Sequence, residues 1–121
     1  MEYQSTVEMV SEVMPGVRYR IARMSFGRRL ELTRRVRELT GRLRYLEAGD
    51  QIGERAEAAV LANEIEKLYL EWGLREIHGL VIDGQAATTA VLVEAGPEAL
   101  CREISAAIRN ECGLSEEERK N

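Results

Sequence analysis

The sequence predicts an α+β fold that is predominantly helical, with a long antiparallel helical hairpin, a small two-stranded sheet and one or two shorter C-terminal helices. Two long segments, 25–48 and 50–74, carry apolar residues at helical spacing and meet at Gly49. Two short runs, 17–22 and 77–82, are apolar or alternating in the way that is typical of strands. The predicted order along the chain is therefore β-α-α-β-α-α.

Residues 1–14 contain few apolar groups and no clear period, which predicts a flexible lead, either a frayed helix or a disordered segment. Pro15 and Gly16 interrupt whatever precedes them. The remainder, 15–121, has the size of one domain, and we expect a single helical domain there.

The run 17–22 alternates apolar and basic residues strictly. This pattern predicts a half-buried strand whose inward side chains are Val17, Tyr19 and Ile21. We expect its partner in the sheet to be 77–82.

Asp83 and Gly84 follow 77–82 and are a strong signal for a tight hairpin turn. The next residues, 85–87, are poor strand formers, so the turn leads either to a second strand or to a loop.

The segment 25–48 is expected to be the longest helix, with Ser25 as its N-cap and Gly49 at its end. Arginines fill most of the arc opposite its apolar residues. The apolar stripe predicted for this helix consists of Phe26, Leu30, Val36, Leu39, Leu43 and Leu46.

The second helix is expected to begin at Asp50 and to end near Gly73, a natural C-cap. Its predicted apolar stripe consists of Ala58, Leu61, Ile65, Leu68 and Trp72. So short a connection makes two helices pack as an antiparallel hairpin, and we expect these two stripes to form the structural core.

Beyond the turn, Thr88 or Thr89 is expected to cap a short helix that Gly96 ends. A further helix is expected from Pro97 to Cys112. A capping box then predicts the start of a last helix, and its residues are Ser115 and Glu118.

Charge is divided unevenly along the chain. Residues 1–44 contain ten arginines and five acidic residues, whereas 45–121 contain sixteen acidic residues and seven Lys and Arg, for a net charge of −4. Such a chain can bind an acidic partner with its basic half, or a second copy of itself head to tail. The candidate interaction surface is the set of arginines on the first long helix, Arg28, Arg29, Arg34, Arg35, Arg37, Arg42 and Arg44.

These arginines fit two readings. They could neutralise the phosphates of a nucleic acid, which would make the protein a small nucleic-acid-binding regulator that uses helix 25–48. No aromatic residue is interleaved with them for base stacking, and the whole chain is acidic, which argues against nucleic acid. Arginine is also enriched in protein–protein interfaces, where its planar fork matches carboxylates.

No catalytic motif is present, so we expect no enzyme, no catalytic residue, no cofactor and no metal. His78 is the single histidine, and a structural or surface role is expected for it. Cys101 and Cys112 would lie about 16 Å apart along one helix, too far for a disulfide. No apolar run approaches the length of a membrane span, and the N-terminus lacks the apolar core of a signal peptide.

Short motifs in the carboxyl-terminal half carry a resemblance to a known group. They are Trp72-Gly73-Leu74, Asp83-Gly84, Gly96-Pro97-Glu98, Gly113-Leu114-Ser115 and Glu118-Arg119-Lys120-Asn121. Together they resemble the tail assembly chaperones of tailed bacteriophages and prophages. The Arg-rich front half departs from that group.

The resemblance implies a non-enzymatic helical factor in the cytoplasm of a bacterial host. Its implied partners are phage tail proteins, namely the tape measure protein and the tail tube, and the resemblance also allows a homo-oligomer. The group has no catalytic residues, so the resemblance assigns no site.

Overall fold

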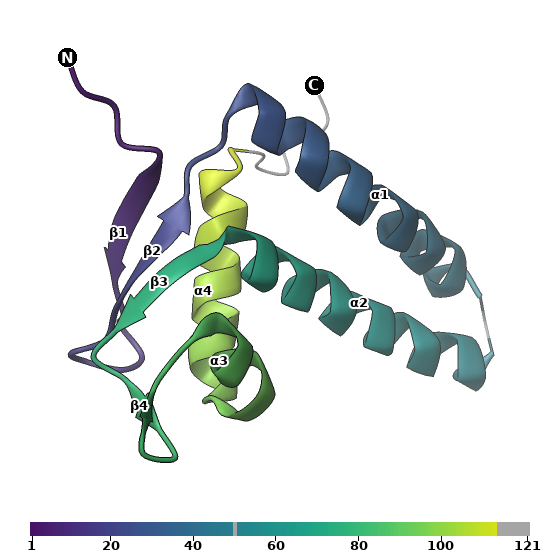
Figure 1. Ribbon diagram of the computed structural model, residues 1–121. Coiled ribbons are helices and arrows are strands. Elements are labelled where there is room, and N and C mark those ends of the chain that lie inside the picture. Colours follow the sequence, from purple (N-terminus) through teal and green to yellow (C-terminus); the bar gives the residue numbers. More distant parts are fainter. Residues whose placement is uncertain (50, 114–121) are drawn as a thin grey trace. The chain divides into compact units, whose positions relative to one another are not determined.

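The computed structural model describes residues 1–49 and 51–113, and its fold is α+β and predominantly helical, as predicted (Figure 1). The elements are β1 (Thr6–Val10), β2 (Arg18–Ala22), α1 (Phe26–Glu47), α2 (Ile52–Gly73), β3 (Leu74–His78), β4 (Val81–Ile82), β5 (Gln85–Ala86), α3 (Thr89–Ala95) and α4 (Glu98–Glu111). The predicted helix start at Asp50 and the predicted capping box of Ser115 and Glu118 lie outside the described residues.

The chain divides into two compact units. Unit 1 consists of Met1–Met24 and Tyr69–Asn121, and unit 2 consists of Ser25–Leu68. Helix α2 begins in unit 2, and its last residues, from Tyr69, belong to unit 1. The sequence indicated one domain over 15–121 and gave no sign of this division, because α2 runs through the boundary without a break.

The sheet of unit 1 has three antiparallel strands in the order β1-β2-β3, not the two that the sequence predicted. The additional strand, β1, lies within 1–14, where we expected a flexible lead. Val7 and Met9 are half-buried, while Glu8 and Val10 on the other side are exposed. Because Val10 is apolar although it is exposed, the polarity of the sequence alternates only weakly. Pairing with the strongly alternating β2 therefore decides its structure.

The second predicted strand is displaced and divided. β3 begins at Leu74, directly after α2, and ends at His78. Gly79 follows with φ +84°, and a Cβ at this position would collide with the carbonyl of Gly16. A strand over 77–82 is therefore wrong, because the chain turns at Gly79.

The Asp-Gly turn leads to a second strand, which is one of the two predicted alternatives. Ile82 pairs with Gln85, and the two turn residues, Asp83 and Gly84, have φ of 51° and 81°. Two successive positive φ values are what a type I′ turn requires, and the turn therefore imposes a strand on a weak strand sequence.

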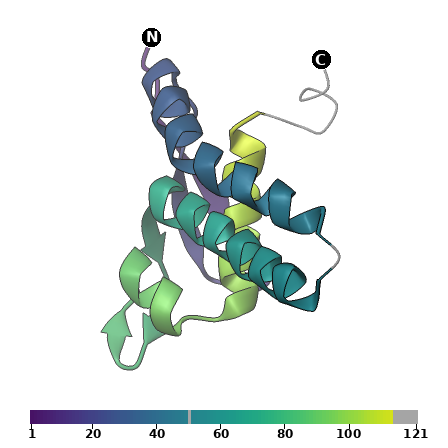
Figure 2. The ribbon, with the colours of Figure 1, turned by 90° about the vertical axis from the view of Figure 1, so that its right-hand side faces the viewer.

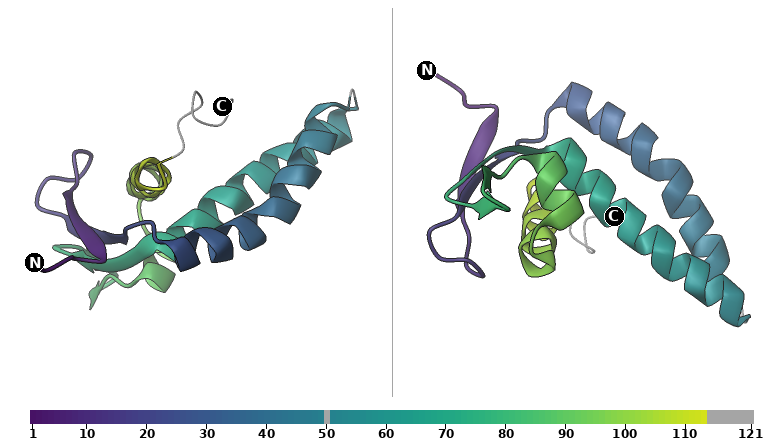
Figure 3. Two further views of the ribbon diagram at one scale, coloured as in Figure 1. Left: turned by 90° about the horizontal axis from the view of Figure 1, so that it is seen from above. Right: turned by 60° about the horizontal axis from the view of Figure 1, so that its bottom comes forward.

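The core of unit 1 lies between the sheet and the C-terminal helices. The inward residues predicted on β2, Val17, Tyr19 and Ile21, are all buried. Helix α4 lies beside β2 (Figures 1 and 3). Its apolar face and that of α3 supply side chains of 0 % exposure, namely Leu92, Leu100, Ile104 and Ile108.

Unit 2 is a helical hairpin in which α1 and the first part of α2 run antiparallel (Figure 2). The predicted N-cap is confirmed, since the Ser25 hydroxyl accepts a hydrogen bond from the Arg28 amide at 3.2 Å. Among the described residues of unit 2, few apolar side chains are buried, namely Leu32, Ala58, Leu61 and Ile65.

The apolar stripe predicted for α1 is partly wrong. Phe26 and Leu30 are 88 % and 54 % exposed, whereas Leu32, which the prediction omitted, is buried. At 3.6 residues per turn, Leu30 lies on nearly the opposite side of the helix from Leu32. The hairpin therefore forms only part of the core that the sequence predicted. Leu61, from the stripe predicted for α2, is 1 % exposed, but the side chains of 0 % exposure belong to unit 1.

Within 1–49 and 51–113, no helix is both long enough and apolar enough to span a membrane.

Candidate functional site

Helix α1 carries all seven arginines of the predicted interaction surface, together with three acidic residues, Glu31, Glu38 and Glu47. Six of the arginines are exposed, and Arg28 is half-buried. The helix places them all around its circumference, so the structure separates the predicted surface into groups that face different ways.

One line of arginines follows a spacing of seven residues, Arg28, Arg35 and Arg42. On α2, Glu57 and Glu64 have the same spacing. In an antiparallel hairpin that turns at 49–50, Arg35 lies level with Glu64 and Arg42 lies level with Glu57. Arg35 also forms an ion pair with Glu31 at 3.9 Å on its own helix. The spacing thus places this line at the same levels of the hairpin as the two glutamates of α2.

A different set points away from Leu32. We call Phe26, Leu30, Arg37 and Arg44 the outer face of α1, because their spacing of four, seven and seven residues keeps them within a narrow arc. All four are exposed. The three acidic residues of α1 lie outside this arc, which leaves the outer face basic at one end and apolar at the other. Arg29 and Arg34 lie on its two flanks.

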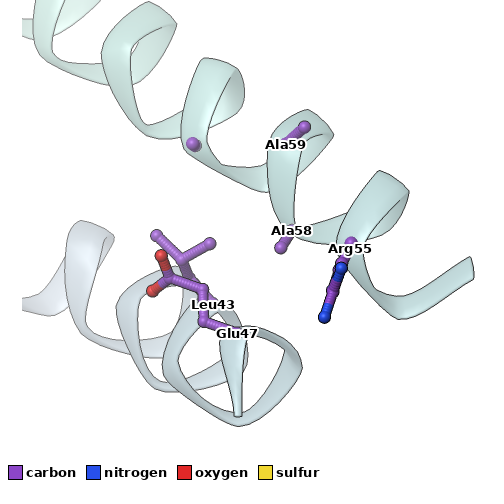
Figure 4. Close-up of a pocket in the computed structure, with 6 residues that line it drawn as sticks. Leu43, Glu47, Arg55, Ala58 and Ala59 are labelled. Atoms are coloured by element: carbon purple, nitrogen blue, oxygen red, sulfur yellow. The ribbon is translucent and has the colours of Figure 1, made fainter. Parts of the chain in front are cut away.

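Near the closed end of the hairpin the two helices leave a hollow of about 340 Å³ (Figure 4). Alanines make up half of its lining on α1 and α2, and the lining residues are Leu43, Glu47, Arg55, Ala58, Ala59 and Ala62. Because alanine side chains are short, they leave space where larger residues would close the seam. The sequence analysis missed this hollow, although the three alanines within five positions of α2 were a visible signal.

A second hollow, of about 350 Å³, lies in unit 1 between the β1–β2 hairpin and α4. Its apolar lining includes Met9, Tyr19 and Ile21, and its polar lining includes Glu12 and Glu103. Burial, together with the negative charges of Glu103 and Glu12, raises the pKa of Tyr19 to about 12. The hollow is therefore acidic as well as partly apolar.

Glu103 fixes the connection between β1 and β2. Its carboxylate accepts hydrogen bonds from the Ser11 hydroxyl at 2.7 Å, from the Glu12 amide at 2.7 Å and from the Val13 amide at 3.3 Å. Ser11 is buried, and its hydroxyl in turn accepts from the Met14 amide at 3.0 Å. Sequence reasoning missed this arrangement, since about ninety residues separate the two sides.

The single histidine and the two cysteines lie apart from one another. His78 is exposed, and its Nε2 lies 3.2 Å from a carboxylate oxygen of Glu76. Burial, and to a lesser degree Glu98, raises the pKa of the Cys101 thiol, which donates to the Leu92 carbonyl at 3.5 Å. Both Cys101 and Cys112 are free thiols. In the part of the chain that the structure describes, no group of three or more His, Cys, Asp and Glu is placed to hold a metal.

The chain matches no protein-family model, no curated protein and no solved structure at a significant level. The features of this chain that can bind a partner are the exposed outer face of α1 and the two hollows.

Proposed function

We propose that this protein is a non-enzymatic assembly factor that acts by binding another protein, in the manner of the phage tail assembly chaperones that its sequence resembles. The observation that carries the proposal is the outer face of α1, where exposed Phe26 and Leu30 adjoin Arg37 and Arg44 with no acidic residue between them.

This combination is typical of protein-binding surfaces. Aromatic residues and arginine are the types most enriched at the centre of interfaces, and burying one large apolar side chain contributes roughly 1.5–3 kcal/mol. A partner helix or extended segment with apolar residues beside carboxylates would cover Phe26 and Leu30 and pair with Arg37 and Arg44.

The finer assignment, a factor for phage tail proteins such as the tape measure protein, is supported by the carboxyl-terminal motifs. In unit 1 these motifs occupy the ends of helices and a turn, at Gly73, Asp83-Gly84, Gly96 and Gly113. A tape measure protein is long and apolar, and a factor that covers apolar segments during assembly needs exposed apolar contacts of its own.

The experiment is co-expression of the full chain with a tape measure segment that is insoluble alone, followed by measurement of its soluble fraction. We expect the intact chain to keep the segment in solution. The double variant Phe26→Ser with Leu30→Ser should reduce the recovered complex by about tenfold or more, which corresponds to the loss of one strong contact. Arg42→Gln, on the same helix but outside the outer face, is the matched control and should leave recovery within about twofold.

The same protein, titrated with DNA and with RNA over a range of salt concentrations, tests the alternative reading. Arg37→Glu with Arg44→Glu should abolish any residual gel shift at low salt, and we expect none near 150 mM salt. Tight nucleic-acid binding whose affinity decreases steeply with salt concentration, combined with no solubilising effect, would show that the arginines bind phosphates instead.

A further inference from the structure

The outer edge of β1 offers unpaired main-chain groups. Two hydrogen bonds fix the pattern, from the Ser11 amide to the Val17 carbonyl at 2.9 Å and from the Arg23 amide to the Ser5 carbonyl at 3.0 Å. In an antiparallel pair, residues alternate between bonding to the partner strand and pointing away from it. Residues 5, 7, 9 and 11 therefore bond to β2, while the amides and carbonyls of Thr6, Glu8 and Val10 point outward.

This edge lacks three of the usual protections against a further strand. Proteins commonly block an edge with proline, lysine or a bulge. β1 contains neither proline nor lysine, and its pairing with β2 runs without a register shift. The one charged side chain, Glu8, is engaged by Arg18 at 3.5 Å and by Arg20 at 3.8 Å. Within the described residues, β1 pairs with β2 alone.

The hollow of unit 1 adjoins this edge, because residues of β1 and of α4 line it. Met9 and Val10 of β1 line it directly, so a strand added to β1 would place every second side chain toward it. The charged residues of the lining are all carboxylates, Glu12, Glu103 and Glu111. Glu103 is engaged by the β1–β2 connection, and Glu111 lies 3.8 Å from Arg23. The exposed Glu12 is the carboxylate best placed to meet a cation from outside.

We propose that an extended segment of a partner protein adds to β1 as a fourth strand, with an apolar side chain over the hollow and a lysine or arginine beside Glu12. Main-chain hydrogen bonds to Thr6, Glu8 and Val10 supply affinity, and the hollow supplies selection by size and charge. This surface lies in unit 1 and does not depend on the outer face of α1.

The probe is a short acetylated peptide in which valine and threonine alternate and two lysines follow. Its counterpart carries two glutamates in place of the lysines. Amide hydrogen exchange by NMR on the full chain gives the readout. We expect the lysine peptide to slow exchange at Thr6, Glu8 and Val10, and to leave Val7 and Met9 unchanged because β2 already protects them. The glutamate peptide should bind at least about fivefold more weakly, since its charge repels Glu12.

Val10→Pro is the decisive variant. It removes an outward amide but none of the hydrogen bonds to β2, and edge strands tolerate proline at such positions. It should weaken peptide binding by about tenfold or more, whereas Val10→Thr, which keeps the amide, should stay within about threefold. A lysine peptide that is N-methylated at alternate residues tests the same hydrogen bonds without altering the protein.

Three results would overturn the proposal. The first is unchanged binding both to Val10→Pro and of the N-methylated peptide. The second is equal binding of the lysine and glutamate peptides. The third is protection of the same amides in the protein alone, together with a dimer in sedimentation. The last result would identify a second copy of the chain as the occupant of β1.

Discussion

The two compact units differ sharply in how completely they bury their apolar residues. Unit 1 contains side chains that are entirely buried, among them Leu100, Ile104 and Ile108. Unit 2 is made of long helices, yet its large apolar residues Phe26, Tyr45 and Ile52 are 77–88 % exposed. Helix length is thus a poor guide to where a chain is stabilised, because burial is what removes apolar surface from water.

The difference has a functional meaning. Surfaces that bind partners are commonly drawn from the less stable parts of a fold, where few buried contacts resist rearrangement. The hairpin of unit 2 matches this description, since alanines line the hollow near its closed end and its outer face exposes Phe26 and Leu30. Unit 1 is the well-packed part of the molecule, and β1 is an edge strand of its sheet whose outer main-chain groups can bind a partner.

The largest expected effect comes from a truncation in the core of unit 1. Ile104→Ala removes a side chain of 0 % exposure and should lower the free energy of unfolding by about 2–5 kcal/mol. The counterpart in unit 2 is Leu39→Ala. Leu39 is only half-buried, so its truncation should cost about 1 kcal/mol.

Urea unfolding measures both changes. Trp72 is the single tryptophan and is buried in unit 1, so its fluorescence reports that unit, while circular dichroism is dominated by the long helices. Equal losses for the two variants would show that the hairpin is as important for stability as the core of unit 1.

Alanine in place of glycine should have opposite effects in the two units. A Cβ at Gly73 would lie 2.6 Å from Cγ2 of Ile108, a fully buried side chain that has little room to move. Gly73→Ala should therefore destabilise by about 1–3 kcal/mol. Gly41 of α1 has no heavy atom within 4 Å of such a Cβ, and Gly41→Ala should stabilise by about 1 kcal/mol through helix propensity. Thermal unfolding of the two variants gives the signs, and two shifts of the same sign would contradict the comparison.

The elements with strong local signals were predictable from the sequence. The caps Ser25 and Thr88, the Asp83-Gly84 turn and the inward residues of β2 depend on neighbours within a few positions. Each has a side-chain or backbone chemistry that leaves few alternatives.

The features that require distant partners were not predictable. β1 forms because β2 pairs with it, and Glu103 reaches Ser11 across most of the chain. The candidate site was predicted only as a set of arginines. The arginines divide into the outer face and a line at the level of Glu57 and Glu64, and this division depends on which side of α1 is buried. The sequence analysis assigned Phe26 and Leu30 to the buried side, so the division could not be predicted.

A smaller effect is expected from the long-range hydrogen bonds of Glu103. Glu103→Ala leaves the buried Ser11 hydroxyl and two amides without this acceptor, which should cost about 1–3 kcal/mol. Glu98→Ala on the same helix removes an exposed pair with Arg102 at 2.7 Å and should cost no more than about 0.5 kcal/mol. Amide exchange of residues 11–13 should accelerate in Glu103→Ala alone. Equal stability of the two variants would show that the hydrogen bonds of Glu103 to residues 11–13 do not stabilise unit 1.

The smallest effect at neutral pH, and the clearest dependence on pH, should come from Tyr19→Phe. The pKa of Tyr19 is raised from its ordinary value of 10.0 to about 12 by burial, and by the charges of Glu103 and Glu12. Its neutral form is therefore favoured in the folded protein, so its contribution to stability is complete below pH 10 and is lost as the pH rises toward 12. The stability of the native chain relative to Tyr19→Phe should fall over this interval and stay constant from pH 7 to pH 9. Urea unfolding of both proteins at each pH gives the difference, in which the titration of all other groups cancels. A difference that does not change up to pH 12 would mean that the phenol is solvated, and that the hollow between β1 and α4 is far more open to water than the buried position of Tyr19 indicates.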